Sequence, residues 1–275
     1  MMPGVRALTS PALAALILLT SCSLHDKPEP ESRPWGGPEH DLRAQWVAEP
    51  GIDLLTGIAI PVRAYIESFQ LAQFTQNAND LYPGFDHAVL PNEPDSLNEF
   101  AQDRRPTFKP GSGSLAMVGN LRFHLTAVDQ SESGATATVC QYNYGAAAKS
   151  GDNYRSLTGG PNLGPDESEG LFAIRVTLSA PSLNSTTDLP PQQGPAPAPS
   201  GDVFGNWQIT GRLTSSSVNS ATESAQWPTY QDDLATCVAK APDPPERRAF
   251  LIEGEHPRSD FPTSPANPGW PAATS

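Results

Sequence analysis

The sequence has few basic residues. Its 275 residues include 17 Lys and Arg against 30 Asp and Glu, which gives a formal net charge of −13 at pH 7. A surface with this excess of negative charge repels nucleic-acid phosphates and anionic lipid headgroups. The composition therefore argues against a role in DNA or RNA binding.

The sequence also lacks an apolar run long enough to cross a membrane as a permanent helix. The apolar stretch at residues 12–19 follows Arg6, the only charged side chain before Asp26. A membrane-spanning helix needs about 20 apolar residues, and small residues rather than a basic cluster follow this shorter run. The pattern predicts a cleaved export signal at residues 1–21.

The end of the apolar run carries a short motif, Leu19, Thr20, Ser21 and Cys22. It resembles the lipobox of bacterial lipoprotein precursors, in which the Cys thiol receives a diacylglycerol and becomes the new amino terminus. The resemblance implies lipidation of Cys22 and anchoring to the outer face of the cell membrane. The alternative is an ordinary signal peptide in which Cys22 is incidental.

Cysteine is scarce, with three residues in the whole chain. Lipidation of Cys22 leaves Cys140 and Cys237, and an exported chain reaches a compartment that permits disulfides. These two residues can then pair without remainder. The alternative is two buried free thiols, because cysteine is also a common core residue.

Residue patterns typical of catalytic and metal sites are missing as well. None of the five His has a second His three or four residues away, so we expect neither a metal nor a cofactor. Asp86 and His87 are the only candidates for an acid–base pair, since His titrates near neutral pH. Adjacent residues do not normally face each other, which favours a solvated pair in a loop.

Proline is concentrated in particular segments of the chain. Such polar, proline-rich stretches favour extended or disordered chain over packed structure. We therefore predict a disordered tether at residues 22–50, one folded domain at 51–240 with a proline-rich insertion at 182–202, and a disordered tail at 241–275.

The periodicity of apolar residues within the domain predicts a helix followed by strands. Apolar residues spaced by three and four predict a helix over 57–76, and a second short helix covers 97–101. Alternating patterns predict a hairpin of strands 121–127 and 135–140, joined by 131–134. Further strands are expected at 171–178, 204–213 and 230–238, with 146–170 as a surface loop.

This order of elements resembles a group of actinobacterial lipoproteins with a cone-shaped domain like that of nuclear transport factor 2. The residues that carry the resemblance are the helix with Val62, Tyr65 and Phe69, and the strands at 137–142 and 205–210. It implies an α+β fold in which an N-terminal helix packs on a curved antiparallel sheet. Most members of this family have no assigned activity, so the resemblance implies a fold and a location.

Cone-shaped folds of this type can enclose an apolar pocket. The aromatic residues that could line it are Tyr65, Phe69, Phe123, Tyr142, Tyr144, Phe172 and Trp207. The alternative is that these rings simply form the core between helix and sheet, since aromatic side chains dominate core burial.

The function expected from the sequence is that of a membrane-anchored envelope lipoprotein. Its domain would bind an envelope protein or an apolar small molecule without catalysis. One alternative is a small enzyme of the cyclase or isomerase kind, which would need a buried Asp or His in the pocket. The other is a structural spacer of the envelope, for which a filled core would be the signature.

Overall fold

The computed structural model describes Met1 and residues 35–109, 115–158, 166, 169–179, 189–218 and 225–273. The chain divides into two compact units, Met1–Glu31 and Ser32–Ser275, and the described strands and helices all belong to the second unit. Residues 2–21 of the predicted leader, Cys22 and the tether up to residue 34 lie outside the described residues.

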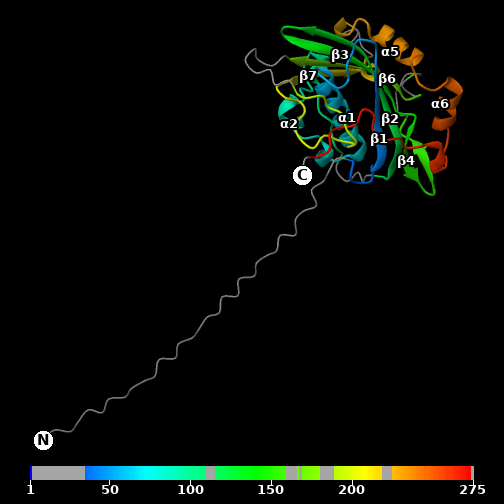
Figure 1. The fold of residues 1–275 in the computed structure, drawn as a ribbon, viewed down its shortest axis with the longest axis horizontal. Helices are drawn as coiled ribbons and strands as arrows, with labels where there is room; N and C mark the ends of the chain where they lie inside the picture. The colour runs from blue at the N-terminus through cyan, green and yellow to red at the C-terminus, as the bar shows by residue number, and fades with distance from the viewer. Residues whose placement is uncertain are drawn as a thin grey trace. The chain divides into compact units, whose positions relative to one another are not determined.

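The core of the second unit is a curled sheet, in which seven strands pair within the described residues (Figure 1). The strands are β1 (Asp41–Ala48), β2 (Met117–Ser131), β3 (Gly134–Tyr142), β4 (Ala146–Ser150), β5 (Asn153–Ser156), β6 (Leu171–Ser179) and β7 (Gln208–Thr214). All pairs are antiparallel except β1 with β2. The predicted α+β class with a curved, mainly antiparallel sheet is thus confirmed.

The register along β2 fixes the order of the strands. β1 pairs with residues 118–125 of β2, while β4 and β3 pair with 117–119 and 122–131. Because these stretches overlap, β3 and β4 lie end to end along the edge of β2 opposite to β1. Beyond β3, β6 pairs with β3, and β7 pairs with β6 at one end of the sheet. At the other end, β5 pairs with β4.

The predicted hairpin is present as β2 and β3. Leu121, Phe123 and Leu125 are buried, while Arg122 and His124 between them are partly exposed, as the alternating pattern predicts. The predicted strand 171–178 corresponds to β6. The strand predicted to begin at 204 begins at Gln208.

Helix α1 (Ala59–Thr75) matches the helix predicted over 57–76. It differs from the expected one-sided helix because every residue from 59 to 72 is buried, including Arg63 and Glu67. A helix that is buried on all sides must be covered by other parts of the chain. The covering segments include Trp35, Tyr82 and Trp270, which share a buried cluster with α1.

The prediction of a disordered tether up to residue 50 is wrong from Trp35 onward. Trp35 is buried, and β1 places Leu42, Ala44 and Trp46 in the core. These residues alternate with polar ones, which is the pattern of a strand with one buried face. The prediction of disorder was based instead on the many Pro, Glu and Gly residues in the surrounding stretch.

Two further predictions of secondary structure are wrong. Residues 146–156, expected in a surface loop, form β4 and β5, which are joined by a tight turn with Gly151 at a positive φ of 58°.

Residues 230–238, expected as a strand, form helix α5 (Tyr230–Ala239). Leu234, Cys237 and Val238 recur at the helical spacing of three and four and contribute to one apolar cluster.

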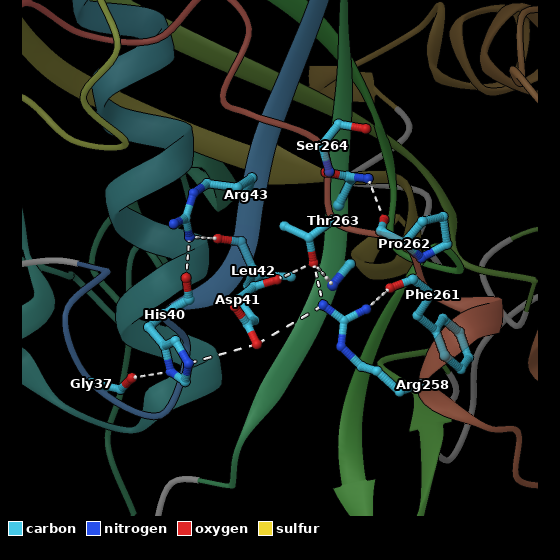
Figure 2. A network of polar contacts seen from close by, with 12 residues as sticks. Gly37, His40, Asp41, Leu42, Arg43, Arg258, Phe261, Pro262, Thr263 and Ser264 are labelled. Carbon is cyan, nitrogen blue, oxygen red and sulfur yellow. Dashed lines mark hydrogen bonds and ion pairs between the residues drawn. The ribbon is translucent and has the colours of Figure 1, made fainter.

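The predicted disordered tail is also ordered, as far as residue 273. It begins with α6 (Pro245–Ile252), after which residues 258–264 dock against the starts of β1 and β2. Figure 2 shows Thr263 at the centre: its Oγ1 donates to the Asp41 carbonyl and accepts from Arg258 Nη2 at 2.8 Å. Asn120 Nδ2 donates to the Pro262 carbonyl at 2.9 Å.

The last described residues complete the edge of the sheet. Asn267 N–H donates to the Ala44 carbonyl, and Trp46 N–H donates to the Asn267 carbonyl at 2.6 Å. The C-terminal segment therefore covers the edge of β1 that β2 leaves unpaired, which protects it from pairing with another chain.

The two faces of the sheet carry separate buried clusters. On β3, Ala137 and Val139 belong to the cluster that contains α1 residues, whereas Cys140 and Tyr142 belong to the cluster formed with α5 and α6. Figure 1 shows these helices on different sides of the strands. A disulfide joins Cys140 of β3 to Cys237 of α5, which confirms the predicted pair.

In the part of the chain that the structure describes, no helix combines the length and the apolar character needed to cross a membrane.

Candidate functional site

A cavity of about 420 Å³ is lined by the C-terminal half of α1 and by strands β3, β6 and β7. Its polar wall includes Gln70, Asp103, Gln141, Asn143 and Arg212. Gln141 alternates on β3 with Cys140 and Tyr142, which face α5 and α6, so its own side chain faces α1. The register of the sheet therefore directs a row of polar groups inward.

At the end of β3, two carboxamides form a pair, one on the strand and one directly after it. Gln141 Nε2 donates to Asn143 Oδ1 at 2.8 Å, and both residues are at most 5% exposed. Gln141 Oε1 is buried and has no hydrogen-bond partner among the described residues. Burying such an acceptor unpaired is unfavourable, and buried polar groups in folded proteins rarely lack a partner.

On β7, the guanidinium of Arg212 carries the only positive charge among the described residues that line the cavity. Its Nη1 lies 3.1 Å from Asp103 Oδ2, and its plane stacks over the Phe69 ring with 4.0 Å to the ring centroid. Arg212 is buried, whereas the Asp103 side chain is half-exposed. Desolvation raises the pKa of Asp103, and the positive charge of Arg212 opposes this shift.

The rest of the lining combines hydroxyl groups with apolar surface. Thr214 Oγ1 lies 2.9 Å from Ser216 Oγ and 3.1 Å from Ser217 Oγ, in the 3₁₀ turn that follows β7. Phe74 and Phe172 contribute rings to the same cavity. It can therefore offer hydrogen bonds and aromatic contacts to one small molecule.

The aromatic residues predicted to line a pocket mostly pack in the core. Tyr65, Phe69 and Phe123 are buried with the α1 cluster, and Tyr65 OH donates to the Arg104 carbonyl at 2.7 Å. Desolvation raises the pKa of Tyr65. For these three residues the structure agrees with the alternative expectation, a core between helix and sheet.

The remaining predicted aromatics are distributed over three places. Tyr142 and Tyr144 lie in the cluster on the other face of the sheet, where Tyr142 OH donates to the Cys237 carbonyl at 3.0 Å. Trp207 lines a second, smaller cavity of about 260 Å³ together with Phe204 and Pro61. Phe172 alone among the predicted aromatics lines the larger cavity.

The structure does not bring Asp86 and His87 together as an acid–base pair. Both lie on the short helix α2 (Phe85–Ala88), with side chains that are 87% and 61% exposed. Asp86 Oδ1 lies 3.3 Å from Arg105 Nη1, and His87 Nε2 lies 3.2 Å from Asp202 Oδ2. Neither residue lines the larger or the smaller cavity.

Glu67 on α1 carries a buried carboxyl group and is 1% exposed. Its Oε1 accepts from Trp46 Nε1 at 2.7 Å, and its Oε2 accepts from Trp270 Nε1 and Tyr82 OH, each at 2.8 Å. Tyr82 OH in turn accepts from Trp35 Nε1 at 2.7 Å. We call these five residues the Glu67 cluster.

Arg63, one helical turn before Glu67, supports this cluster with its charge. It is buried, stacks over the Trp270 ring at 4.4 Å, and donates to the carbonyls of Leu54 and Pro268 at 2.9 and 2.7 Å. Burial raises the pKa of Glu67, while the Arg63 guanidinium and the three hydrogen bonds oppose the shift. Glu67 lines neither of these two cavities, and its hydrogen bonds connect segments that are distant in the sequence around α1.

Metal binding finds no support in the described residues. No three of their His, Cys, Asp and Glu side chains are grouped so that they could hold a metal ion.

In comparisons with known proteins, no family model matches the chain, and neither a curated protein nor a solved structure gives a significant match. A function for this chain is therefore proposed from its cavity and from the leader that the sequence predicts.

Proposed function

We propose that the protein is a lipid-anchored lipoprotein of the cell envelope whose folded unit binds a small polar molecule without catalysis. The binding site is the cavity of about 420 Å³ between α1 and strands β3, β6 and β7. In this proposal α1 packs on the concave face of the sheet, in the cone-like arrangement that the family resemblance implies.

The observation that carries the proposal is the set of buried polar side chains in the cavity wall. Gln70, Gln141, Asn143, Arg212 and Thr214 are each less than 10% exposed. Burying polar groups costs free energy unless they are hydrogen-bonded, and Gln141 Oε1 has no partner among the described residues. With a rotation of this side chain toward the cavity, a bound ligand would supply that partner, so the ligand is polar and not apolar as the sequence suggested.

Catalysis is the second candidate, and one feature favours it. Asp103 is the only carboxyl group among the described residues that line the cavity, and its pKa is raised, as a general base requires. Its ion pair with Arg212 favours binding instead, because the carboxylate is already engaged. A purely structural spacer would not need an open cavity with polar walls.

The binding site is tested by ligand-observed NMR on a panel of small neutral, anionic and cationic solutes. At least one should bind the wild-type protein and should bind Gln141→Leu with an affinity lower by about fivefold or more. Loss of one hydrogen bond is worth about 1 kcal/mol or more, and about 1.4 kcal/mol is tenfold in affinity.

The matched control is Gln130→Leu, which makes the same change at an exposed position of β2 and should bind like the wild type. The thermal midpoint of Gln141→Leu should be equal to that of the wild type or somewhat lower, because the substitution removes an unpaired oxygen but also leaves the buried Asn143 Oδ1 without its donor. If no solute distinguishes Gln141→Leu from the control, the cavity is not the binding site.

Anchoring is tested by Cys22→Ala. We expect the variant to move from the membrane fraction to the soluble fraction of the envelope, because two acyl chains hold a protein stably at about 0.8 kcal/mol for each buried CH₂. Metabolic labelling with an alkyne fatty acid should mark the wild type and not the variant. Ser23→Ala is the neighbouring control and should remain labelled and membrane-bound. Retention of Cys22→Ala in the membrane fraction would show that another feature holds the protein there.

A further inference from the structure

We propose that the ligand of the cavity is an uncharged polyhydroxylated ring compound, of the class of sugars and cyclitols. This inference rests on the proposed function, because it names the chemical class that the same cavity selects.

The charges of the cavity favour a neutral ligand. Among the described lining residues, Arg212 and Asp103 are the only ionised side chains, and they pair with each other at 3.1 Å. An anion that approached Arg212 would meet the Asp103 carboxylate, and a cation at Asp103 would meet the guanidinium. A neutral molecule leaves the ion pair intact and faces no like charge.

The uncharged polar groups favour a ligand that donates and accepts hydrogen bonds along one edge. The wall includes the carboxamides of Gln70, Gln141 and Asn143, a group type that holds a donor and an acceptor in one plane; Gln141 Nε2 and Asn143 Oδ1 are bonded to each other, which leaves Gln141 Oε1 and the Asn143 NH₂ group for a ligand. The hydroxyls of Thr214 and Ser216 can do either, according to their rotation. Vicinal hydroxyl groups match this mixture because each of them also donates and accepts.

The unpaired acceptor within the wall points to a ligand hydroxyl. Gln141 Oε1 is buried without a partner among the described residues, although the amide nitrogen of the same side chain is bound to Asn143. The unpaired Nε of Arg212 is less informative, since the buried Arg63 and Arg104 also have an unpaired Nε. A rotation of the Gln141 side chain toward the cavity would let Oε1 accept from a ligand hydroxyl, which would complete the hydrogen bonds of the carboxamide.

The apolar part of the lining suits the C–H faces of a ring. Phe74, Phe172, Leu157 and Ile174 line the same cavity as the carboxamides. A sugar ring has polar edges and two less polar faces, so one orientation can satisfy both kinds of lining. The volume of about 420 Å³ is at the small end of ligand sites, which span about 300–1,000 Å³, and suits one or two sugar rings.

The experiment measures binding of chosen probes by saturation-transfer NMR and calorimetry. The neutral polyols are methyl α-glucopyranoside, methyl α-mannopyranoside, methyl α-arabinofuranoside, trehalose and myo-inositol. The comparison probes are citrate as an anion, spermidine as a cation and cyclohexanol as a mainly apolar ring. We expect at least one polyol to bind, with binding that is weaker by about fivefold or more to Gln141→Leu and to Thr214→Val and unchanged to Gln130→Leu.

The outcomes separate this inference from the proposed function. If a comparison probe binds in a manner that depends on Gln141 and no polyol does, the ligand class is wrong and the binding function stands. If no probe of any class binds in a Gln141-dependent manner, both are wrong. Thr214→Val replaces one hydroxyl with a methyl group of similar size. It therefore tests the same cavity independently if Gln141→Leu does not fold correctly. Near-ultraviolet circular dichroism of each variant checks that the fold is retained.

Discussion

Replacing Glu67 with leucine is expected to lower the free energy of unfolding by about 3–5 kcal/mol, the range for removing one partner of a buried charge pair. The substitution leaves the indole N–H groups of Trp46 and Trp270 and the hydroxyl of Tyr82 without their acceptor. It also leaves the buried guanidinium of Arg63 without its nearby carboxyl group. Chemical denaturation followed by tryptophan fluorescence measures the loss, and two tryptophans that contact Glu67 report on it directly.

The neutral variant Glu67→Gln should lose less stability than Glu67→Leu. Its amide oxygen still accepts hydrogen bonds, but its NH₂ group is a donor that faces another donor in the cluster. Glu132→Leu is the matched control, because Glu132 is exposed in the turn between β2 and β3 and substitutions there usually change stability by less than about 0.5 kcal/mol. A Glu67→Leu protein within about 1 kcal/mol of the wild type would show that the cluster does not stabilise the fold.

The elements that could be predicted from the sequence are those whose pattern is local. The apolar spacing in α1 and the alternation in β2 and β3 are each decided within one segment, and their bounds agree with the prediction to within a few residues. The α+β fold class and the antiparallel type of the sheet were inferred from the order of these segments along the chain. The parallel pairing of β1 could not be inferred in this way, because its partner lies about 75 residues further along the chain.

Disorder was wrongly predicted for the proline-rich ends because the composition of a segment is an average, which hides single residues that become buried. Trp35 and Trp270 lie in such stretches, and both are at most 4% exposed. A single large aromatic side chain buries 150–250 Å², about as much apolar surface as several small residues. Proline also lowers the conformational entropy of the unfolded chain, so an extended proline-rich segment can be held in place by few contacts. Widely spaced tryptophans in such a segment are therefore a sign of docking.

The candidate site was missed for a related reason. Gln141 and Arg212 are polar residues on strands, and the sequence alone cannot distinguish an inward-facing polar residue from one on an exposed face. The register of β3, β6 and β7 places them on the α1 side of the sheet. One signal was available: Gln141 stands within a run of otherwise apolar or aromatic residues from 137 to 144, with Thr138 and Asn143 as the only other polar residues.

Removal of the disulfide between Cys140 and Cys237 is expected to lower the free energy of unfolding by about 4–5 kcal/mol, because the bridge closes a loop with a sequence separation of 97 residues. In a Cys22→Ala background, the double variant Cys140→Ala/Cys237→Ala is compared with its parent by urea denaturation. Loss of the bridge should also loosen α5, which carries Cys237, and alter the fluorescence of Trp227, whose Nε1 donates to Asp233 of this helix at 2.7 Å.

The control for this comparison is the parent protein unfolded with a reductant, which should reach the stability of the double variant. Alkylation of the denatured, unreduced parent should find no free thiol. Two alkylated cysteines, or a double variant within about 1 kcal/mol of the parent, would contradict the prediction. The bridge matters because α5 and α6 cover the sheet face opposite the cavity, and Cys140 stands directly before Gln141 on β3. A loosened α5 should therefore weaken ligand binding as well, since the strand that positions Gln141 loses its covalent support from the other face.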